Sequence, residues 1–121
     1  MKKREKSIKN LINNKLLLEV LADSKIKNKI KKAIINKADK NLIKAIEESV
    51  LNVLAGNIHI SEPEFNKLKK SKSVLRKLVK QKNIESKKLL LQQRGGFLSI
   101  ILPSVITGLS TIISSLINKK E

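Results

Sequence analysis

Apolar residues recur at helical spacing through the first part of the chain, and they predict a series of short helices. Before residue 22 the apolar stripe consists of Ile8, Leu11, Ile12, Leu16 and Val20. A second helix is expected after a cap at Asp23 or Ser24. Its apolar face would hold Ile26, Ile30, Ala33 and Ile34.

The third predicted helix is the most apolar of this region, and we expect it to be the core element. It would begin after a cap at Asp39 and stop at Gly56. Its stripe consists of Leu42, Ile43, Ile46, Val50, Val53 and Leu54. Glu47 and Glu48 also lie on it, and adjacent positions on a helix diverge by about 100°, so they do not converge on one site.

Three further helices are expected before residue 96. In the segment Ser-Glu-Pro-Glu, Ser61 can cap a helix, Pro63 suits its first turn, and Glu64 completes a capping box. Another helix would open at Ser71 or Ser73, and the next would run from about Ser86 to Gln93. The alternation of strands and helices that marks a parallel sheet is not found in the sequence. The fold class predicted is therefore all-α, a small bundle of short helices.

The pattern changes after residue 96, where residues 97–117 carry no charged side chain. On a helical wheel, one face is aliphatic and the other is rich in Ser and Thr. We expect the residues that would contact a membrane to be Phe97, Leu98, Leu102, Val105, Leu109, Ile112, Ile113 and Leu116. The sequence thus predicts two parts, a basic helical domain over residues 1–96 and an apolar amphipathic C-terminal segment over residues 97–121.

Three interpretations of the C-terminal segment remain open. A helix over residues 97–117 would be about 31 Å long, near the hydrocarbon thickness of a bilayer, although Pro103 and the hydroxyl residues weaken a plain transmembrane anchor. A surface-lying or pore-forming amphipathic helix fits the two-faced pattern better. The third interpretation is that the segment is simply the last helix of the fold, packed on the apolar surface of the body.

Charge indicates the kind of partner that the body binds. The net charge is +17, and residues 97–121 contribute only Lys119, Lys120 and Glu121 as charged groups. Such a body attracts DNA, RNA or an anionic membrane surface. We expect DNA phosphates to be contacted by Lys25, Lys27, Lys29, Lys31, Lys32, Lys67, Lys69, Lys70, Lys72, Arg76, Lys77, Lys80, Lys82, Lys87 and Lys88.

The residue inventory argues against several other functions. The chain has no cysteine and only one histidine, His59, so the common zinc sites and a Ser-His-Asp triad lack their residues. We therefore expect no enzyme activity, no metal and no cofactor. Trp and Tyr are absent, which argues against stacking on single-stranded bases. A cellular DNA or RNA chaperone, or a soluble lysine-rich protein without a polyanion partner, remains an alternative.

Gly95 and Gly96 lie where the basic part meets the apolar part. Their simplest role is to end the preceding helix. A second interpretation is a protease site, because cysteine proteases that cut after Gly-Gly have a channel too narrow for side chains. Cleavage after Gly96 would release a peptide that begins at Phe97. A double-glycine leader of a peptide toxin fits poorly, since the leader would be long and strongly basic.

Three blocks of the sequence, "ADKNLIKAIEESVLNVLAGNI", "KLKKSKSVLRKLV" and "LLLQQRGGFL", resemble a family of small basic proteins encoded by animal Polinton/Maverick elements and the related adintoviruses. Their layout is similar to that of adenovirus core and membrane-lytic proteins. The resemblance implies a virion location, capsid proteins as neighbours, and an adenovirus-type cysteine protease that would cut between Gly96 and Phe97. Such sites prefer Met, Ile or Leu where this chain has Gln93.

These observations favour a virion-associated protein that binds and condenses DNA without sequence preference. The alternative is a membrane-active protein whose C-terminal helix disrupts or anchors to a host membrane.

Overall fold

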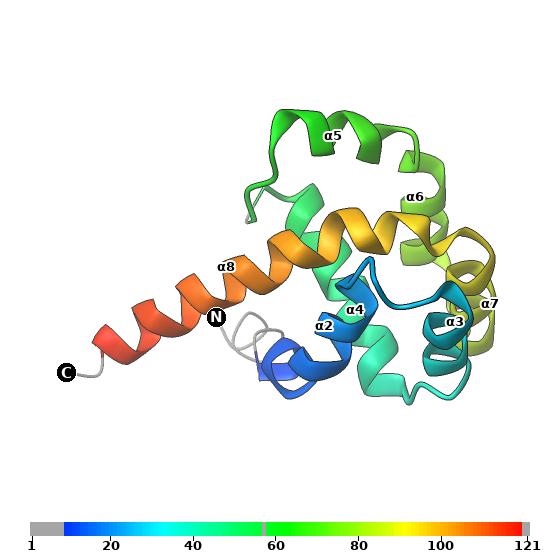
Figure 1. Cartoon of the computed structure of the whole chain (residues 1–121), viewed down its shortest axis with the longest axis horizontal. Coiled ribbons are helices and arrows are strands. Elements are labelled where there is room, and N and C mark those ends of the chain that lie inside the picture. The colour runs from blue at the N-terminus through cyan, green and yellow to red at the C-terminus, as the bar shows by residue number, and fades with distance from the viewer. Residues whose placement is uncertain (1–8, 57, 120–121) are drawn as a thin grey trace.

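The computed structural model describes residues 9–56 and 58–119, with side chains described up to residue 108, and all regular structure in this part is helical. Residues 9–13 form a first helical turn. The helices that follow are α2 (Lys15–Ala22), α3 (Asn28–Asn36), α4 (Lys40–Leu54), α5 (Glu62–Lys69), α6 (Lys72–Lys80), α7 (Ile84–Arg94), the 3₁₀ turn η1 (Gly95–Phe97) and α8 (Leu98–Lys119) (Figure 1). The predicted all-α class is confirmed.

Side-chain caps set the N-terminal ends of two helices at the predicted residues. The Asp39 carboxylate accepts a hydrogen bond from the Leu42 N–H at 2.8 Å and starts α4. Gly56, with φ of 78°, follows its end in the left-handed conformation that glycine tolerates best. At α5 the Ser61 hydroxyl accepts from the Glu64 N–H and donates to the Glu64 carboxylate at 2.7 Å. The Glu64 carboxylate therefore bonds to the Ser61 hydroxyl, whereas in the predicted capping box it would bond to the Ser61 backbone N–H.

The predicted stripe of the first helix is wrong apart from Leu11. The buried residues are Leu11, Leu18 and Leu21, whose i, i+7 and i+10 spacing puts them on one face of a regular helix, while Leu16 is 74% exposed. The Asn14 side-chain amide donates to the Asn10 carbonyl at 2.8 Å, and α2 begins at Lys15. Asparagine side chains commonly bond to the nearby backbone in this way. Ile8 lies outside the described residues.

The second predicted helix begins later than expected. Asp23 does not cap it; its carboxylate accepts from the Lys25 N–H at 2.8 Å and closes a local turn. The helix α3 starts at Asn28, and Lys27 precedes it without a side-chain cap. The residue that α3 buries is Ile35, whereas Ile30 is 50% exposed. The predicted apolar face was therefore displaced around the helix.

The core is formed by α4 together with the first turns of α8. Helix α4 buries its predicted stripe except Leu54, and it also buries Ala45 and Ser49, whose hydroxyl donates to the Ala45 carbonyl. Phe97 and α8 contribute Leu98, Ile101, Leu102 and Val105, each no more than 4% exposed. Helix α8 packs against α2, α4 and α5, and its C-terminal part extends away from the body (Figure 1). The start of the predicted tail therefore shares one core with the basic domain.

Truncation after Gly96 should unfold the protein, because it removes five buried side chains from the core. Each large apolar truncation costs about 2–5 kcal/mol, whereas a whole domain is stable by about 5–15 kcal/mol. Thermal unfolding followed by circular dichroism should show no cooperative transition for residues 1–96.

A chain that ends at Gly108 is the matched control for this truncation, since it keeps every buried residue described here. It should retain a cooperative transition. A fragment 1–96 that melts like the full chain would contradict this account of the core.

Candidate nucleic-acid interface

The longest run of basic residues without an acidic one lies on α5, α6 and the residues that follow them, since the sequence has no acidic residue between Glu64 and Glu85. Helix α6 buries Val74, Leu75 and Leu78, which turns its remaining positions to the surface. We call the exposed basic set on these elements the basic ridge: Lys67, Lys69, Lys70, Lys72, Arg76, Lys77, Lys80 and Lys82. All eight side chains belong to exposed residues.

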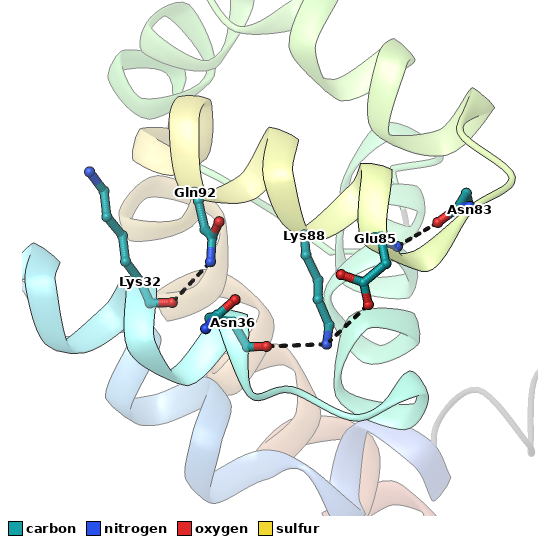
Figure 2. Close-up of polar contacts among 6 residues, drawn as sticks. All are labelled: Lys32, Asn36, Asn83, Glu85, Lys88 and Gln92. Carbon is teal, nitrogen blue, oxygen red and sulfur yellow. Dashed lines mark hydrogen bonds and ion pairs between the residues drawn. The ribbon is translucent and has the colours of Figure 1, made fainter.

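A second basic set surrounds α3. Lys25, Lys27, Lys29 and Lys32 are exposed and Lys31 is half-buried, and we call these five the α3 lysines. Helix α3 is held against α7 by polar contacts: the Lys88 ammonium donates to the Asn36 carbonyl at 3.3 Å, and the Gln92 amide donates to the Lys32 carbonyl at 3.4 Å (Figure 2). The Asn36 carbonyl is at the C-terminus of α3, where helices lack internal donors, so the Lys88 ammonium supplies one there.

Lys87 and Lys88, two of the expected phosphate ligands, have structural partners instead. The Lys87 ammonium is 2.7 Å from the Glu47 carboxylate, and the two side chains are only 12% and 17% exposed. Lys88 is 14% exposed and also lies 3.9 Å from the Glu85 carboxylate (Figure 2). Because these groups tie α7 to α4 and α3, we remove both lysines from the set of proposed phosphate contacts.

The remaining basic groups have little acidic compensation. Within the described part of the chain, ion pairs engage only Lys15, Lys87 and Lys88. In the basic ridge, the Lys69 ammonium lies over the Phe65 ring, 5.2 Å from its centre. Unpaired lysines repel one another and raise the local positive potential, which a polyanion would neutralise.

Both basic sets border α7. Helix α7 packs against both α3 and α6. In Figure 1 these three helices gather at one end of the molecule, while the C-terminal part of α8 leaves from the other end. The fold thus separates the basic helices from the free end of the apolar helix.

The Gly-Gly junction does not form an extended hinge, because helical structure continues through it. Helix α7 ends at Arg94, one residue after the predicted Gln93, and η1 leads directly into α8. Neither glycine has a positive φ, and an added side-chain carbon would meet only Leu98 at Gly95 and nothing at Gly96. Phe97, the residue after the expected cut, is 1% exposed. Local backbone geometry therefore does not require this glycine pair.

The residues expected to contact a membrane fall into two groups, those before residue 108, which are buried, and those after it. Phe97, Leu98, Leu102 and Val105 are buried in the core, together with Ile101, which the helical-wheel argument missed. The side chains of Leu109, Ile112, Ile113 and Leu116 lie outside the described part. By length and composition, one described run, Ile84–Gly108, is apolar enough to cross a membrane, and 33% of its apolar window is buried in the fold.

The described residues contain no group of three or more His, Asp or Glu side chains placed to hold a metal ion, and His59 is exposed. The Glu47–Lys87 pair was not expected, because forty positions separate the partners and periodicity carries no signal for such a contact.

Comparison with known proteins gives no relative for this chain: no family model, no curated protein and no solved structure matches it.

Cleavage between Gly96 and Phe97 should be slow in the folded protein, because a protease needs an extended segment and Phe97 is in the core. The substitution Leu102→Ala removes a fully buried side chain and should cost about 2–5 kcal/mol. If cleavage follows the open population, Leu102→Ala should speed it by at least about thirtyfold. Intact mass during digestion with a Gly-Gly-specific cysteine protease measures this rate.

The control for this digestion is Lys44→Ala, at an exposed position of α4, which should leave the rate unchanged. Equal cleavage of all three proteins would mean that the bond is accessible without unfolding.

Proposed function

We propose that this chain is a non-enzymatic protein that binds DNA without sequence preference and condenses it through lysine–phosphate contacts. The observation that carries the proposal is the set of exposed, unpaired basic residues on the basic ridge and the α3 lysines. Each phosphate neutralised releases a condensed counterion, which is the main driving force of non-specific DNA binding.

The residues available favour phosphate contacts over base reading. Of the two aromatic residues, Phe97 is buried and Phe65 lies beneath the Lys69 ammonium. Arg76 is the one arginine in the two basic sets, and lysine acts on a phosphate as a compact point charge. Affinity should therefore depend on salt rather than on sequence.

Condensation requires that one protein contact more than one duplex segment. The basic ridge and the α3 lysines are carried by separate elements, since α6 and α3 each pack on α7. Each set would engage a separate duplex. The resemblance to small basic proteins of Polinton/Maverick elements suggests the setting, a packaged genome in a virion with capsid proteins nearby.

The salt dependence of DNA binding tests the basic ridge. The double variant Lys77→Gln/Lys80→Gln should lower the slope of log K against log salt by about 1.8, if each lysine contacts one phosphate. Fluorescence anisotropy with labelled duplexes of unrelated sequence, over a series of salt concentrations, measures the slope.

The matched control is Lys40→Gln/Lys44→Gln, which removes the same charge from two exposed lysines of α4 outside the proposed set. Its slope should stay close to that of the unmodified protein. Binding that ignores salt, or equal losses in both double variants, would overturn the assignment.

A second candidate function, membrane disruption, is favoured by the course of α8. This helix continues to Lys119, its C-terminal part extends from the body, and residues 97–117 are uncharged (Figure 1). Pro103 opposes a simple transmembrane role, because it has no N–H to donate to the Ser99 carbonyl one turn earlier. A helix lying at the bilayer surface would leave this carbonyl in contact with water.

A synthetic peptide of residues 97–121 should release dye from anionic vesicles at micromolar concentration. The full chain should release much less, because Phe97, Leu98, Leu102 and Val105 are held in the core. Absence of leakage with the peptide would remove this candidate function, and it would leave the DNA proposal unaffected.

A further inference from the structure

An apolar groove lies between α2, α3 and the start of α4. Of the residues proposed to contact DNA, only Lys29 lines it. The volume of the groove is about 670 Å³. The apolar side chains that line it are Leu17, Ile30, Ala33, Ile34, Ala38 and Leu42. The two alanines leave room that a larger residue would fill.

Several of these side chains are exposed to water. Leu17 is 40% exposed and Ile30 is 50% exposed. Half of the large hydrophobic residues that the described part exposes lie between Ile12 and Ile30. Exposed apolar side chains that line a groove commonly mark an interaction site.

The rim of the groove is cationic. Lys29 and Lys37 both line it, about 12 Å apart along the axis of α3. Both are exposed, and neither forms an ion pair within the described residues. Asp39 is the one acidic residue at the groove, and its carboxylate is engaged by the Leu42 N–H.

Charge and shape together select the occupant. A second copy of the chain carries +17 and would be repelled, and residues 1–7 of the same chain are also basic. Phosphates of a nucleic acid would meet the lysines but leave the apolar floor wet. A bilayer surface is flat and cannot fill a hollow. An amphipathic helix fits, since its apolar stripe enters such grooves at i, i+3, i+4 and i+7 spacing.

We propose that the groove binds an acidic amphipathic helix of a partner protein. Aliphatic side chains of that helix occupy the hollow over Ala33 and Ala38, and its carboxylates pair with Lys29 and Lys37. Because Lys29 is also one of the α3 lysines, the helix and DNA compete for this side of the molecule. The inference stands on the groove and its rim, and it holds whether or not DNA is the polyanion.

The test uses the full-length chain and a labelled synthetic helix of about 16 residues, about 24 Å long, with leucines on one face and glutamates on the other. Saturable binding is expected in the micromolar range by fluorescence anisotropy. Ala33→Trp, which fills the groove, should weaken binding of the peptide by at least about tenfold. Ile30→Glu, at an exposed position, should do the same by placing a like charge beside the peptide.

The matched control separates the groove from general attraction to a basic protein. Lys77→Gln/Lys80→Gln on the basic ridge should change peptide binding by less than about twofold, because these lysines are outside the groove. A peptide with lysines in place of the glutamates should not bind. Circular dichroism should give the unmodified spectrum for every variant.

Three results would overturn the proposal. The first is no saturable binding, and the second is binding that Ala33→Trp and Ile30→Glu leave unchanged. The third is that these two substitutions instead abolish self-association in sedimentation, or abolish binding to vesicles that contain phosphatidylglycerol. That result would assign the groove to a second copy or to lipid.

Discussion

The fold depends on the burial of one face of α8 against α2 and α4. Phe97, Leu98, Ile101, Leu102 and Val105 are almost completely removed from water. They share one buried cluster with residues of α2 and α4, among them Leu18, Leu21, Ile46 and Val50. The short helices before residue 96 have little stability of their own, since isolated helices under about 12 residues are marginal in water. A helix from the far end of the sequence therefore closes the core, and the basic helices are displayed on a framework that this closure holds together.

Charge is tolerated because it is sorted by position. The few lysines with acidic or backbone partners link helices: Lys87 joins α7 to α4 through Glu47, and Lys88 joins α7 to α3 through the Asn36 carbonyl. The larger number remain at the surface, where water and salt reduce their mutual repulsion. Lysine thus stabilises the fold where it links two helices, and at the surface it provides the positive potential that would attract a polyanion.

Local signals made part of this structure predictable from the sequence. The caps at Asp39 and Ser61 and the glycine at residue 56 act within a few residues, so α4 and α5 were predicted with the right starts. The stripe of the first helix was misplaced because Leu11, Leu18 and Leu21 are also at helical spacing, and only packing selects which apolar face is buried. In the second helix the Asp23 turn delays the start of α3 to Asn28, and Ile35 rather than Ile30 faces the core. Contacts between distant positions, such as Glu47 with Lys87 or α8 with α2, were beyond reach because periodicity carries no information on which elements meet. The roles of the basic ridge and the Gly-Gly pair stay predictions.

The free end of α8 has a mechanical consequence. Helix α8 is held by its packing against α2, α4 and α5, and a side-chain carbon added at Gly108 would lie at an ordinary van der Waals distance, 3.4 Å, from Ile58 in the loop after α4. From residue 108 the helix extends about 16 Å further to Lys119. A small tilt of the packed part of α8 is therefore magnified at the tip, in the way that a lever multiplies displacement beyond its fulcrum. The direction in which the apolar end leaves the molecule is set by the core that holds the start of the helix.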